Sequence, residues 1–466
     1  MSQIATFVYI VGILGLFVLD RKGTARISKA CWLPIVWLLI NGSRPVSLWL
    51  QIEPRNLADQ SLEGNPLDRN IYLGLIIAGA IVLWGRQTTV VRLLRANPSI
   101  LLFLVFCALS VSWSDYPDVA FKRWIKFLGD LVMVLIVISD PQRLSAIKRV
   151  LSTVAFILIP TSVLLIKYYP EMARYYSRWE GTMFVSGVAV DKNMLGMTCL
   201  VFGLGAWWQL LGAWREKGRE RRRRLIAHGA ILTMVLWLFW MANSATSGSC
   251  FVMAGGLMAI TSVVRAARKP AVLHFLVAAV LCASVSVLFL DIGGGALHAL
   301  GRNSTLTGRT EIWKGLLDFS GNPLFGTGFE SFWVGERLRK IWATGGLLYG
   351  INESHNGYLE VFLNEGWIGL TLLAAIIVGG YREIVRAVRR DPQTHCLNLA
   401  YFVAVLVYNL TEAAFKAVSP MWFVFVWAVI DGSAESTRGN KEYLVRHRPS
   451  SETSLYDVRT ADLLPS

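Results

Sequence analysis

Apolar runs of membrane-spanning length recur along nearly the whole chain. A helix needs about 20 apolar residues to cross a bilayer, and somewhat shorter runs also count as predicted crossings. The runs lie at 4–19, 32–50, 71–84, 99–113, 124–139, 150–167, 193–213, 225–242, 250–264, 271–290, 367–380, 397–414 and 417–431. Only 17% of the 466 residues are charged, too few to cover a soluble protein of this size. The pattern therefore predicts an all-α polytopic membrane protein with about 12–13 transmembrane helices.

The sequence predicts specific structures at the two ends of this membrane region. The first run, 4–19, has no basic residues before it, and Arg21 and Lys22 follow it. That order predicts a first membrane helix and not a cleaved signal peptide. The last two runs are joined so closely around Lys416 that they are expected to form a hairpin.

The distribution of Lys and Arg predicts the orientation of the chain. With the N-terminus outside, more than half of the basic residues fall on six short inner loops, of which 214–224 is the densest. We interpret its block Arg221–Arg224 as a topology signal beside anionic lipid. The net charge of +15 is therefore not taken to indicate nucleic-acid binding.

The polar outer segments hold the candidate chemistry. The longest of them, 291–366, interrupts a transmembrane domain expected to span 1–431. A loop of roughly 75 residues without a membrane run is more often functional than a simple connector. Two helix-like pieces are expected in it, near 309–318 and 355–364, and the polar segment 432–466 is expected to be a disordered cytoplasmic tail.

Two arginines on the outer side are candidates for binding a phosphate group. Arg178 lies in YSRWEG, close to the start of the next membrane run at Asn193, where either a phosphate clamp or an anchor to lipid headgroups fits the sequence. Arg309 lies in GRTEIW, at the expected N-terminus of an amphipathic helix whose free N–H groups favour an anion. A structural ion pair with Glu311 or Glu330 is the alternative for Arg309.

A histidine in the same long loop is the candidate base. His355 has Glu353 two residues before it and Asn356 directly after it. An imidazole with an ordinary pKa of about 6.5 takes up a proton near neutral pH, and a nearby carboxylate orients it and raises its basicity. A purely structural histidine is the alternative. The other outer histidine, His298, has no acidic neighbour and is interpreted as incidental.

No metal-binding or nucleotide-binding motif accompanies these residues. The outer acidic residues are scattered, with no DxD or HExxH pattern, and the chain has no GxxxxGK[ST] phosphate loop. A group transfer here would need an activated substrate that arrives from the membrane. Arginines would hold its diphosphate leaving group and the histidine would activate a hydroxyl. We expect neither a metal nor another cofactor.

The same stretches resemble the bacterial O-antigen ligase and polymerase superfamily. GRTEIW…GNPLFGTGFESF followed by ESHNGYLEVFLNEGWIGL resembles the long-loop pattern of that superfamily over 300–371. Arg178, Gly181 and Asn193 fit an earlier outer segment of the pattern more loosely. Members transfer glycans from undecaprenyl pyrophosphate to an acceptor hydroxyl at the periplasmic face of the bacterial inner membrane, without a metal.

The resemblance implies a glycosyltransferase of polysaccharide biosynthesis and gives roles to residues. It implies that His355 is the base on the acceptor hydroxyl and that Arg309 and Arg178 bind the donor diphosphate. The further substrate-binding candidates are Asn356, Glu353 and Glu360. The implied partners are a lipid-linked glycan donor, a glycan acceptor and the bilayer, with a chain-length regulator and a flippase as further candidates.

The sequence departs from the superfamily pattern at one place. Many members have a Ser-Arg pair at the outer end of a mid-chain span, where this chain reads NSATSGS (243–249) without an arginine. Together with NGSRPVSLWL and EGNPLDR, this favours the exopolysaccharide-polymerase branch over the lipid A ligases. A transporter of a lipid-linked or anionic solute and a glycan-binding accessory subunit are the competing hypotheses. The position of the notable charges in outer loops and the lack of an inverted repeat disfavour the transporter.

Overall fold

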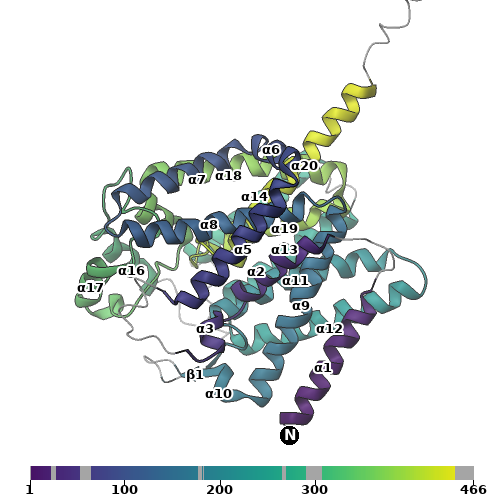
Figure 1. Cartoon of the computed structure of the whole chain (residues 1–466), viewed down its shortest axis with the longest axis horizontal. Coiled ribbons are helices and arrows are strands. Elements are labelled where there is room, and N and C mark those ends of the chain that lie inside the picture. Colours follow the sequence, from purple (N-terminus) through teal and green to yellow (C-terminus); the bar gives the residue numbers. More distant parts are fainter. Residues whose placement is uncertain are drawn as a thin grey trace, which may run out of the picture.

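Helices account for nearly all of the chain described by the structure, a computed structural model covering residues 2–21, 28–52, 64–176, 181, 183–264, 269–289 and 307–446 (Figure 1). The elements up to residue 185 are α1 (Ser2–Leu19), η1 (Lys29–Cys31), α2 (Trp32–Asn41), α3 (Val46–Trp49), α5 (Pro66–Trp84), α6 (Gln87–Arg95), α7 (Pro98–Ser110), η2 (Val111–Trp113), α8 (Pro117–Ile138), α9 (Arg143–Tyr168), α10 (Pro170–Ala173), β1 (Arg174–Tyr176) and β2 (Met183–Val185). The later elements are α11 (Lys192–Trp214), α12 (Arg219–Ala242), α13 (Ala245–Val263), α14 (Pro270–Phe289), α16 (Thr307–Leu317), α17 (Gly335–Ala343), η4 (Gly346–Leu348), α18 (Gly357–Arg390), α19 (Pro392–Tyr408) and α20 (Pro420–Arg446).

The lengths and apolar character of these helices confirm a polytopic membrane protein. Within the described ranges, seven helices are long and apolar enough to cross a membrane, namely α1, α5, α9, α11, α12, α13 and α18. The pair 87–95 and 98–113, bent by 91°, gives an eighth if it is counted as one span. Each predicted apolar run overlaps a helix, but several of those helices are shorter or more charged than a full crossing. The predicted 12–13 crossings therefore exceed the number that length and composition support.

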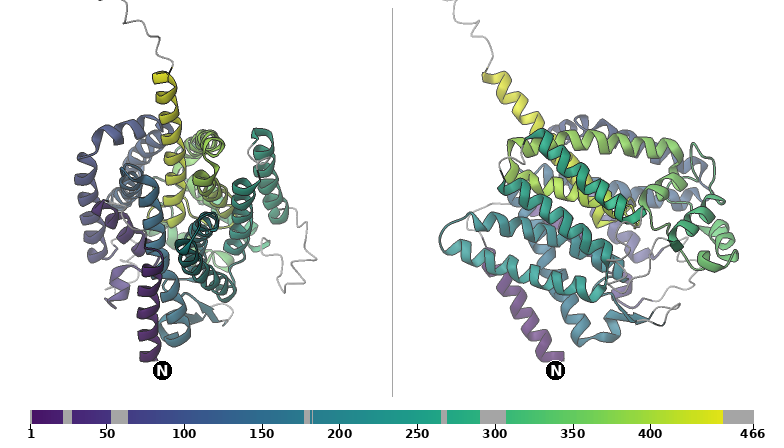
Figure 2. Two further views of the ribbon diagram at one scale, coloured as in Figure 1. Left: turned by 90° about the vertical axis from the view of Figure 1, so that its right-hand side faces the viewer. Right: turned by 180° about the vertical axis from the view of Figure 1, so that it is seen from behind.

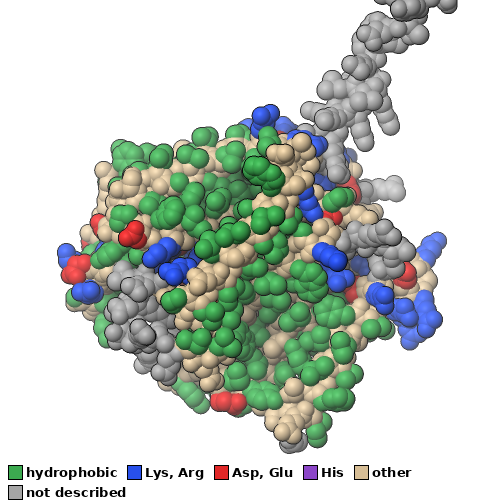
Figure 3. All heavy atoms as spheres, in the orientation of Figure 1, with side chains coloured by type: hydrophobic (Ala, Val, Ile, Leu, Met, Phe, Trp, Pro, Cys, Tyr) green, Lys and Arg blue, Asp and Glu red, His purple; other side chains and the backbone are tan. Residues whose placement is uncertain are grey.

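The helices divide into a buried centre and an apolar periphery. In α9 and α11, 72% and 78% of the apolar window is buried, against 6% and 11% in α1 and α5. Phe7, Ile81 and Trp84 are among the exposed apolar side chains of the outer helices, and Figure 3 shows such side chains spread widely over one face. Since apolar surface in water costs about 25 cal/mol per Å², we assign this face to lipid.

The short elements gather at one side of the bundle. In Figure 1, α3, α10, β1, α16 and α17 lie toward the left and bottom, whereas α6 and the C-terminal end of α20 lie at the top. Figure 2 shows α20 extending beyond the other helices at the side opposite the N-terminus. The only paired strands in the described ranges are β1 and β2, which run antiparallel with Arg174 opposite Val185. They are a small exception to the predicted all-α fold.

The long outer loop contains more helix than the sequence predicts. Helix α16 agrees closely with the predicted piece 309–318, but α17 is not anticipated. The predicted piece 355–364 and the run 367–380 join into α18 across a kink at Gly366, whose φ is 63°. A Cβ at this position would lie 2.3 Å from the carbonyl oxygen of Leu324, so the kink requires glycine.

The connection between the last two helices corrects the predicted ends of their apolar runs. Helix α19 ends at Tyr408 and α20 begins at Pro420, so 409–419 is a polar turn and not part of either helix. Proline at the first position of α20 is favourable, because its missing N–H would have no partner there. The side chain of Asn409 competes with the helix by accepting a hydrogen bond from the N–H of Ala414 at 2.8 Å. The predicted hairpin is present, with a longer connection than the apolar pattern indicates.

Candidate active site

His355 occupies a strained position at the end of the outer loop. Its φ is 51°, in the left-handed region that few residues other than glycine adopt. The flanking residues are held firmly: the carbonyl of Ser354 accepts a hydrogen bond from Trp313 Nε1 at 2.8 Å, and Asn356 Oδ1 caps α18 by accepting from the N–H of Tyr358 at 3.0 Å. Strain of this kind costs on the order of 1–3 kcal/mol and is frequent at functional sites.

The turn after α19 docks against this strained segment. The carbonyl of Asn409 accepts a hydrogen bond from the N–H of Gly357 at 2.9 Å. A Cβ at position 357 would lie 1.9 Å from Asn409 Oδ1, so the close approach requires glycine. The contact brings Glu412 of the turn to His355.

Glu412 connects the residues of the candidate site. Its Oε2 lies 3.5 Å from His355 Nδ1 and accepts a hydrogen bond from Asn193 Nδ2 at 3.2 Å. Its Oε1 lies 3.2 Å from Nη2 of Arg309, and the same guanidinium donates to the carbonyl of Thr411. Arg309 and His355 are therefore brought together by a carboxylate that the sequence analysis did not single out.

Glu353 and Lys416 complete this cluster. Glu353 Oε1 lies 3.1 Å from His355 Nδ1, and its Oε2 accepts a hydrogen bond from Lys416 Nζ at 2.9 Å. Because Nδ1 faces two carboxylates, the proton of a neutral imidazole belongs on Nδ1. The lone pair of Nε2 is then the group that accepts a proton from a ligand.

The carboxylates also change the titration of the histidine. Burial alone would lower the pKa of His355. Glu353 and Glu412 raise it by more than burial lowers it, so that the pKa is about 9. Burial raises the pKa of Glu353, but Lys416 and His355 outweigh this and bring it well below its usual range. At neutral pH the cluster thus holds three cations, His355, Arg309 and Lys416, and two carboxylates.

Three helix N-termini meet at the same cluster. Asn193 lies in the first turn of α11, Arg309 lies in the first turn of α16, and His355 directly precedes the capping residue of α18. The first N–H groups of α11 and α18 already donate to acceptors within the protein, but the dipole at the start of a helix still favours an anion. Three helix dipoles and three cationic side chains together suit a ligand with several negative charges, such as a diphosphate.

The composition of the cluster also raises the question of a metal ion. Glu353, His355 and Glu412 offer ligand atoms that all lie within 4.8 Å of one another. However, the two carboxylates already face Lys416 and Arg309 at 2.9 and 3.2 Å. A divalent cation would be repelled by both side chains. The geometry therefore fits carboxylates that hold cationic side chains better than carboxylates that hold a metal.

The remaining predicted residues have different surroundings. Asn356 caps α18, and its Nδ2 donates to the carbonyl of Leu410 at 3.4 Å. Glu360 is buried and accepts hydrogen bonds from Trp333 Nε1 and from the N–H of Ser354. These contacts shape the segment around His355, and a direct substrate contact by either residue stays a prediction. Arg178 and His298 lie outside the described residues.

The mid-chain segment without an arginine lies beside the site. Thr246 Oγ1 is 3.1 Å from Oγ1 of Thr411, the residue whose carbonyl accepts from Arg309. Within the same segment, Ser244 donates a hydrogen bond to Ser247 at 3.0 Å. The hydroxyl groups of 243–249 are thus close to the guanidinium, but they add no positive charge.

The sequence pattern hides two members of the cluster, Glu412 and Lys416, because they stand at the ends of the last two apolar runs. Glu412 lies within the predicted run 397–414 and is a signal in itself, since ionisable residues within membrane runs are rare and usually functional. The sequence offers Glu311 or Glu330 as the ion-pair partner of Arg309 in the alternative, purely structural interpretation. In the structure the ion-pair partner is Glu412.

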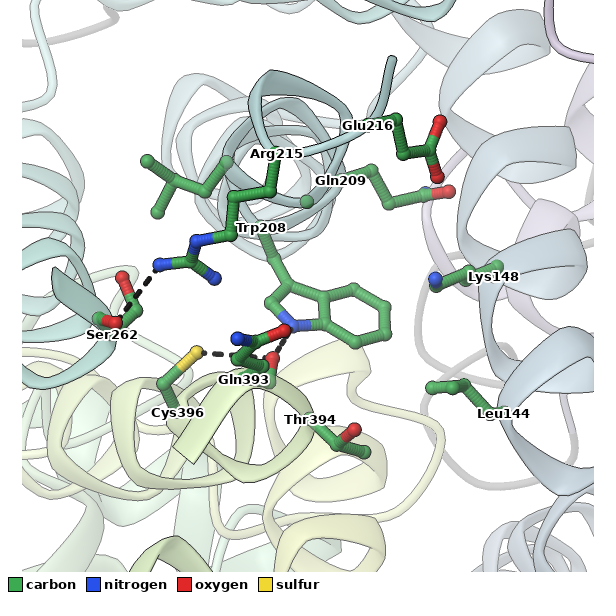
Figure 4. A pocket seen from close by; sticks show the side chains of 12 residues that line it. Leu144, Lys148, Trp208, Gln209, Arg215, Glu216, Ser262, Gln393, Thr394 and Cys396 are labelled. Atoms are coloured by element: carbon green, nitrogen blue, oxygen red, sulfur yellow. Dashed lines mark hydrogen bonds between the residues drawn. The ribbon is translucent and has the colours of Figure 1, made fainter. Parts of the chain in front are cut away.

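Two cavities have polar residues in their walls. One, of about 480 Å³, opens beside Glu353 and Lys416. The other, of about 320 Å³, is shown in Figure 4, where Trp208 Nε1 donates to the carbonyl of Gln393 at 2.8 Å. It includes Arg215 at the end of α11, whereas Asn193 lies at the start of that helix. At 1.5 Å per residue the two ends are about 30 Å apart, so the second cavity is separate from the cluster.

Comparisons with known proteins point to polysaccharide synthesis. Residues 230–374 match the Wzy_C family, described as O-antigen ligase. This range contains Arg309 and His355 and ends before Glu412 and Lys416. The chain is also 28% identical over 311 residues to the exopolysaccharide production protein ExoQ of Rhizobium meliloti (strain 1021), and the match covers 63% of this chain and 67% of the relative.

Proposed function

We propose that the chain, of which residues 230–374 match the O-antigen ligase family, transfers a glycan from an undecaprenyl-pyrophosphate donor to a hydroxyl group of an acceptor glycan, at the periplasmic face of the bacterial inner membrane. This match and the exopolysaccharide production protein that the chain resembles support a role in polysaccharide biosynthesis for this multi-pass membrane protein. The observation that carries the finer proposal is the cluster in which Glu412 lies 3.2 Å from Arg309 and 3.5 Å from His355.

The cluster supplies the groups that a single displacement needs. The acceptor hydroxyl gives its proton to Nε2 of His355, and its oxygen attacks the anomeric carbon of the donor. The bond from that carbon to the diphosphate oxygen breaks, and its electron pair leaves with the diphosphate. Arg309 and the helix N-termini stabilise the charge that develops there. One displacement of this kind inverts the configuration at the anomeric carbon.

The diphosphate needs cationic partners beyond a single guanidinium. Arg309 uses N–H groups on Thr411 and Glu412 and has five in all, which leaves donors for phosphate oxygens. Lys416 is paired with Glu353 and is not proposed as a partner of the diphosphate. We propose Arg178 as the second arginine of the donor site. The position of Asn193 in the cluster supports this, because both residues belong to the same outer segment.

The acceptor is proposed to be a growing exopolysaccharide and not lipid A. The relative from Rhizobium meliloti is named for exopolysaccharide production, and segment 243–249 lacks the arginine that many ligases carry. Polymerase and ligase share the same chemistry and differ in the acceptor. The distinction therefore needs a direct assay.

The direct test uses the purified protein with lipid-linked repeat units extracted from the cells that make it. We expect the glycan to lengthen without any added acceptor, because a polymerase uses its own substrate as acceptor. We also expect a chelator such as EDTA to leave the rate unchanged, since the carboxylates are neutralised by Lys416 and Arg309. Transfer only to a lipid A core would assign a ligase. No transfer to either acceptor would overturn the proposed function, and loss of activity with EDTA would overturn the metal-free mechanism.

The pH dependence of transfer follows from the pKa of His355, about 9. A general base must be neutral, and at pH 7 only about 1% of such a histidine is neutral. We therefore expect the rate at low substrate concentration to rise about tenfold per pH unit from pH 6 and to level off near pH 9. Glu353→Gln removes one of the carboxylates that raise the pKa, so it should move the inflection to lower pH.

A matched control for this profile is Glu311→Gln, which removes an exposed carboxylate from the same helix as Arg309. Its inflection should coincide with that of the unmodified protein. A rate that does not change with pH between 6 and 9 would rule out His355 as the base, and an unmoved inflection in Glu353→Gln would rule out Glu353 as its partner.

A further inference from the structure

The cavity beside the cluster differs in character from the Arg309 side of the site. Its volume of about 480 Å³ lies in the range of about 300–1,000 Å³ typical of pockets for small ligands. Aromatic side chains supply much of the wall, including Phe127 and Phe329, whose ring centroids are 5.1 Å apart, and Trp333 and Trp342. Trp342 is exposed, whereas Phe127 is buried.

The indole rings are fixed in place by their own N–H groups. Trp342 Nε1 donates to the carbonyl of Ile351 at 2.7 Å, and Trp333 Nε1 donates to Glu360. Each ring is therefore held without using its face. A fixed aromatic face is suited to stacking against the apolar side of a sugar ring, and little side-chain freedom is lost on binding.

The polar groups of the cavity lack the excess of cations that a second diphosphate site needs. Its lining contains two cations, Arg123 and Lys416, and four acidic residues, Glu330, Glu353, Glu360 and Glu365. Such a lining disfavours an anion. Carboxylates accept hydrogen bonds from hydroxyl groups, and the amide of Asn352, on an exposed stretch of the lining, can both donate and accept. Aromatic faces and hydroxyl-binding carboxylates together match an uncharged, hydroxyl-rich ligand.

The cavity and the cluster share Glu353. One oxygen of this carboxylate lies 3.1 Å from His355 Nδ1, and the other binds Lys416, which also lines the cavity. Arg309 does not line the cavity and lies on the Glu412 side of His355. His355 Nδ1 thus contacts one carboxylate that lines the cavity and one that holds Arg309, so an acceptor in the cavity and a donor diphosphate at Arg309 would both lie beside the histidine.

We propose that this cavity binds the acceptor glycan, with Trp342 as the stacking surface and Asn352 and Glu353 as hydrogen-bonding groups for sugar hydroxyls; the assignment rests on the transferase function proposed above. The donor diphosphate then occupies the Arg309 side. The two substrates meet at His355, which receives the proton of the acceptor hydroxyl.

The test separates acceptor binding from catalysis. The probe is a set of oligosaccharides released from the cell's own exopolysaccharide by mild acid and labelled at the reducing end with a fluorophore. Its affinity for the purified protein is measured by fluorescence anisotropy, and its KM is measured with the extracted lipid-linked repeat as donor. We expect Trp342→Ala to weaken probe binding and raise the acceptor KM about tenfold, with kcat and the donor KM within about twofold of the unmodified protein. Asn352→Ala should raise the acceptor KM about threefold.

The controls make each outcome decisive. Trp342→Phe keeps an aromatic face and should retain most of the affinity, and Trp113→Ala removes an exposed indole outside the cavity and should change nothing. If Trp342→Ala does not fold, Asn352→Ala decides the result. Unchanged probe affinity in Trp342→Ala or, where that variant does not fold, in Asn352→Ala would overturn the assignment, as would a raised donor KM in place of the acceptor KM. Failure of the unmodified protein to transfer would count against the proposed function, while probe binding would still report on the cavity.

Discussion

We expect His355→Ala to abolish long-chain polysaccharide in a strain whose surface polysaccharide can be measured, while the protein accumulates at its normal level. Alanine removes the Nε2 lone pair that takes the acceptor proton, and loss of a general base typically costs a factor of about 10²–10⁴. Alanine also tolerates the left-handed backbone poorly, so His355→Asn, whose side chain is more compatible with that conformation, provides a second variant. Chain length is read from gel profiles of extracted polysaccharide, and protein level from immunoblots.

Two other histidines serve as controls for this result. His274 lies on α14, is exposed, and has its Nδ1 2.8 Å from the hydroxyl of Tyr381. His274→Ala should leave chain length unchanged, and His298→Ala should be tolerated as well. Normal chain length in both His355 variants would favour the transporter or accessory-subunit hypothesis, because neither of those functions needs a base at this position.

Local sequence signals identify much of this site. The helical piece near 355–364, the start of α16 near Arg309 and the proximity of Glu353 to His355 all depend on residues close together in the chain, and the structure has all three. What short-range patterns cannot supply is the link between them. Glu412 stands 103 residues after Arg309, and only the packing of the turn at 409–419 against α18 brings them together.

The same reasoning explains the error at the end of α19. Hydropathy averages over a window, so an apolar run continues through a few polar residues until their number outweighs it. Asn409, Thr411 and Glu412 lie within the predicted run 397–414, where they appear as tolerated exceptions. The structure shows that they form a turn closed by the Asn409 side chain. Side chains that compete for backbone hydrogen bonds should therefore count against a helix even within an apolar window.

Arg309→Lys tests whether geometry or charge alone matters at the donor site. The guanidinium spans two partners, the Thr411 carbonyl and the Glu412 carboxylate, and is proposed to bind phosphate with its remaining donors. Lysine keeps the charge but concentrates it at one point, so it cannot maintain these contacts together. We expect transfer to fall about 100-fold or more, comparable to the loss of a preorganised donor in other transferases and hydrolases, and Arg309→Ala to fall at least as far.

The matched control is Arg339→Lys, at an exposed residue of α17 that pairs with Glu336 at 3.3 Å. It should transfer glycan at the rate of the unmodified protein.

Kinetics with the lipid-linked donor separate two causes of a loss of transfer in Arg309→Lys. A raised donor KM alone would mean that Arg309 binds the diphosphate equally before and during reaction, and a lowered kcat would mean that it stabilises the leaving group. Near-normal values of both in Arg309→Lys would show that a point charge suffices, and the bidentate site would have to lie elsewhere. Because Glu412 joins Arg309 to His355, a lowered kcat accompanied by a shift in the pH inflection would show that the guanidinium also sets the state of the base.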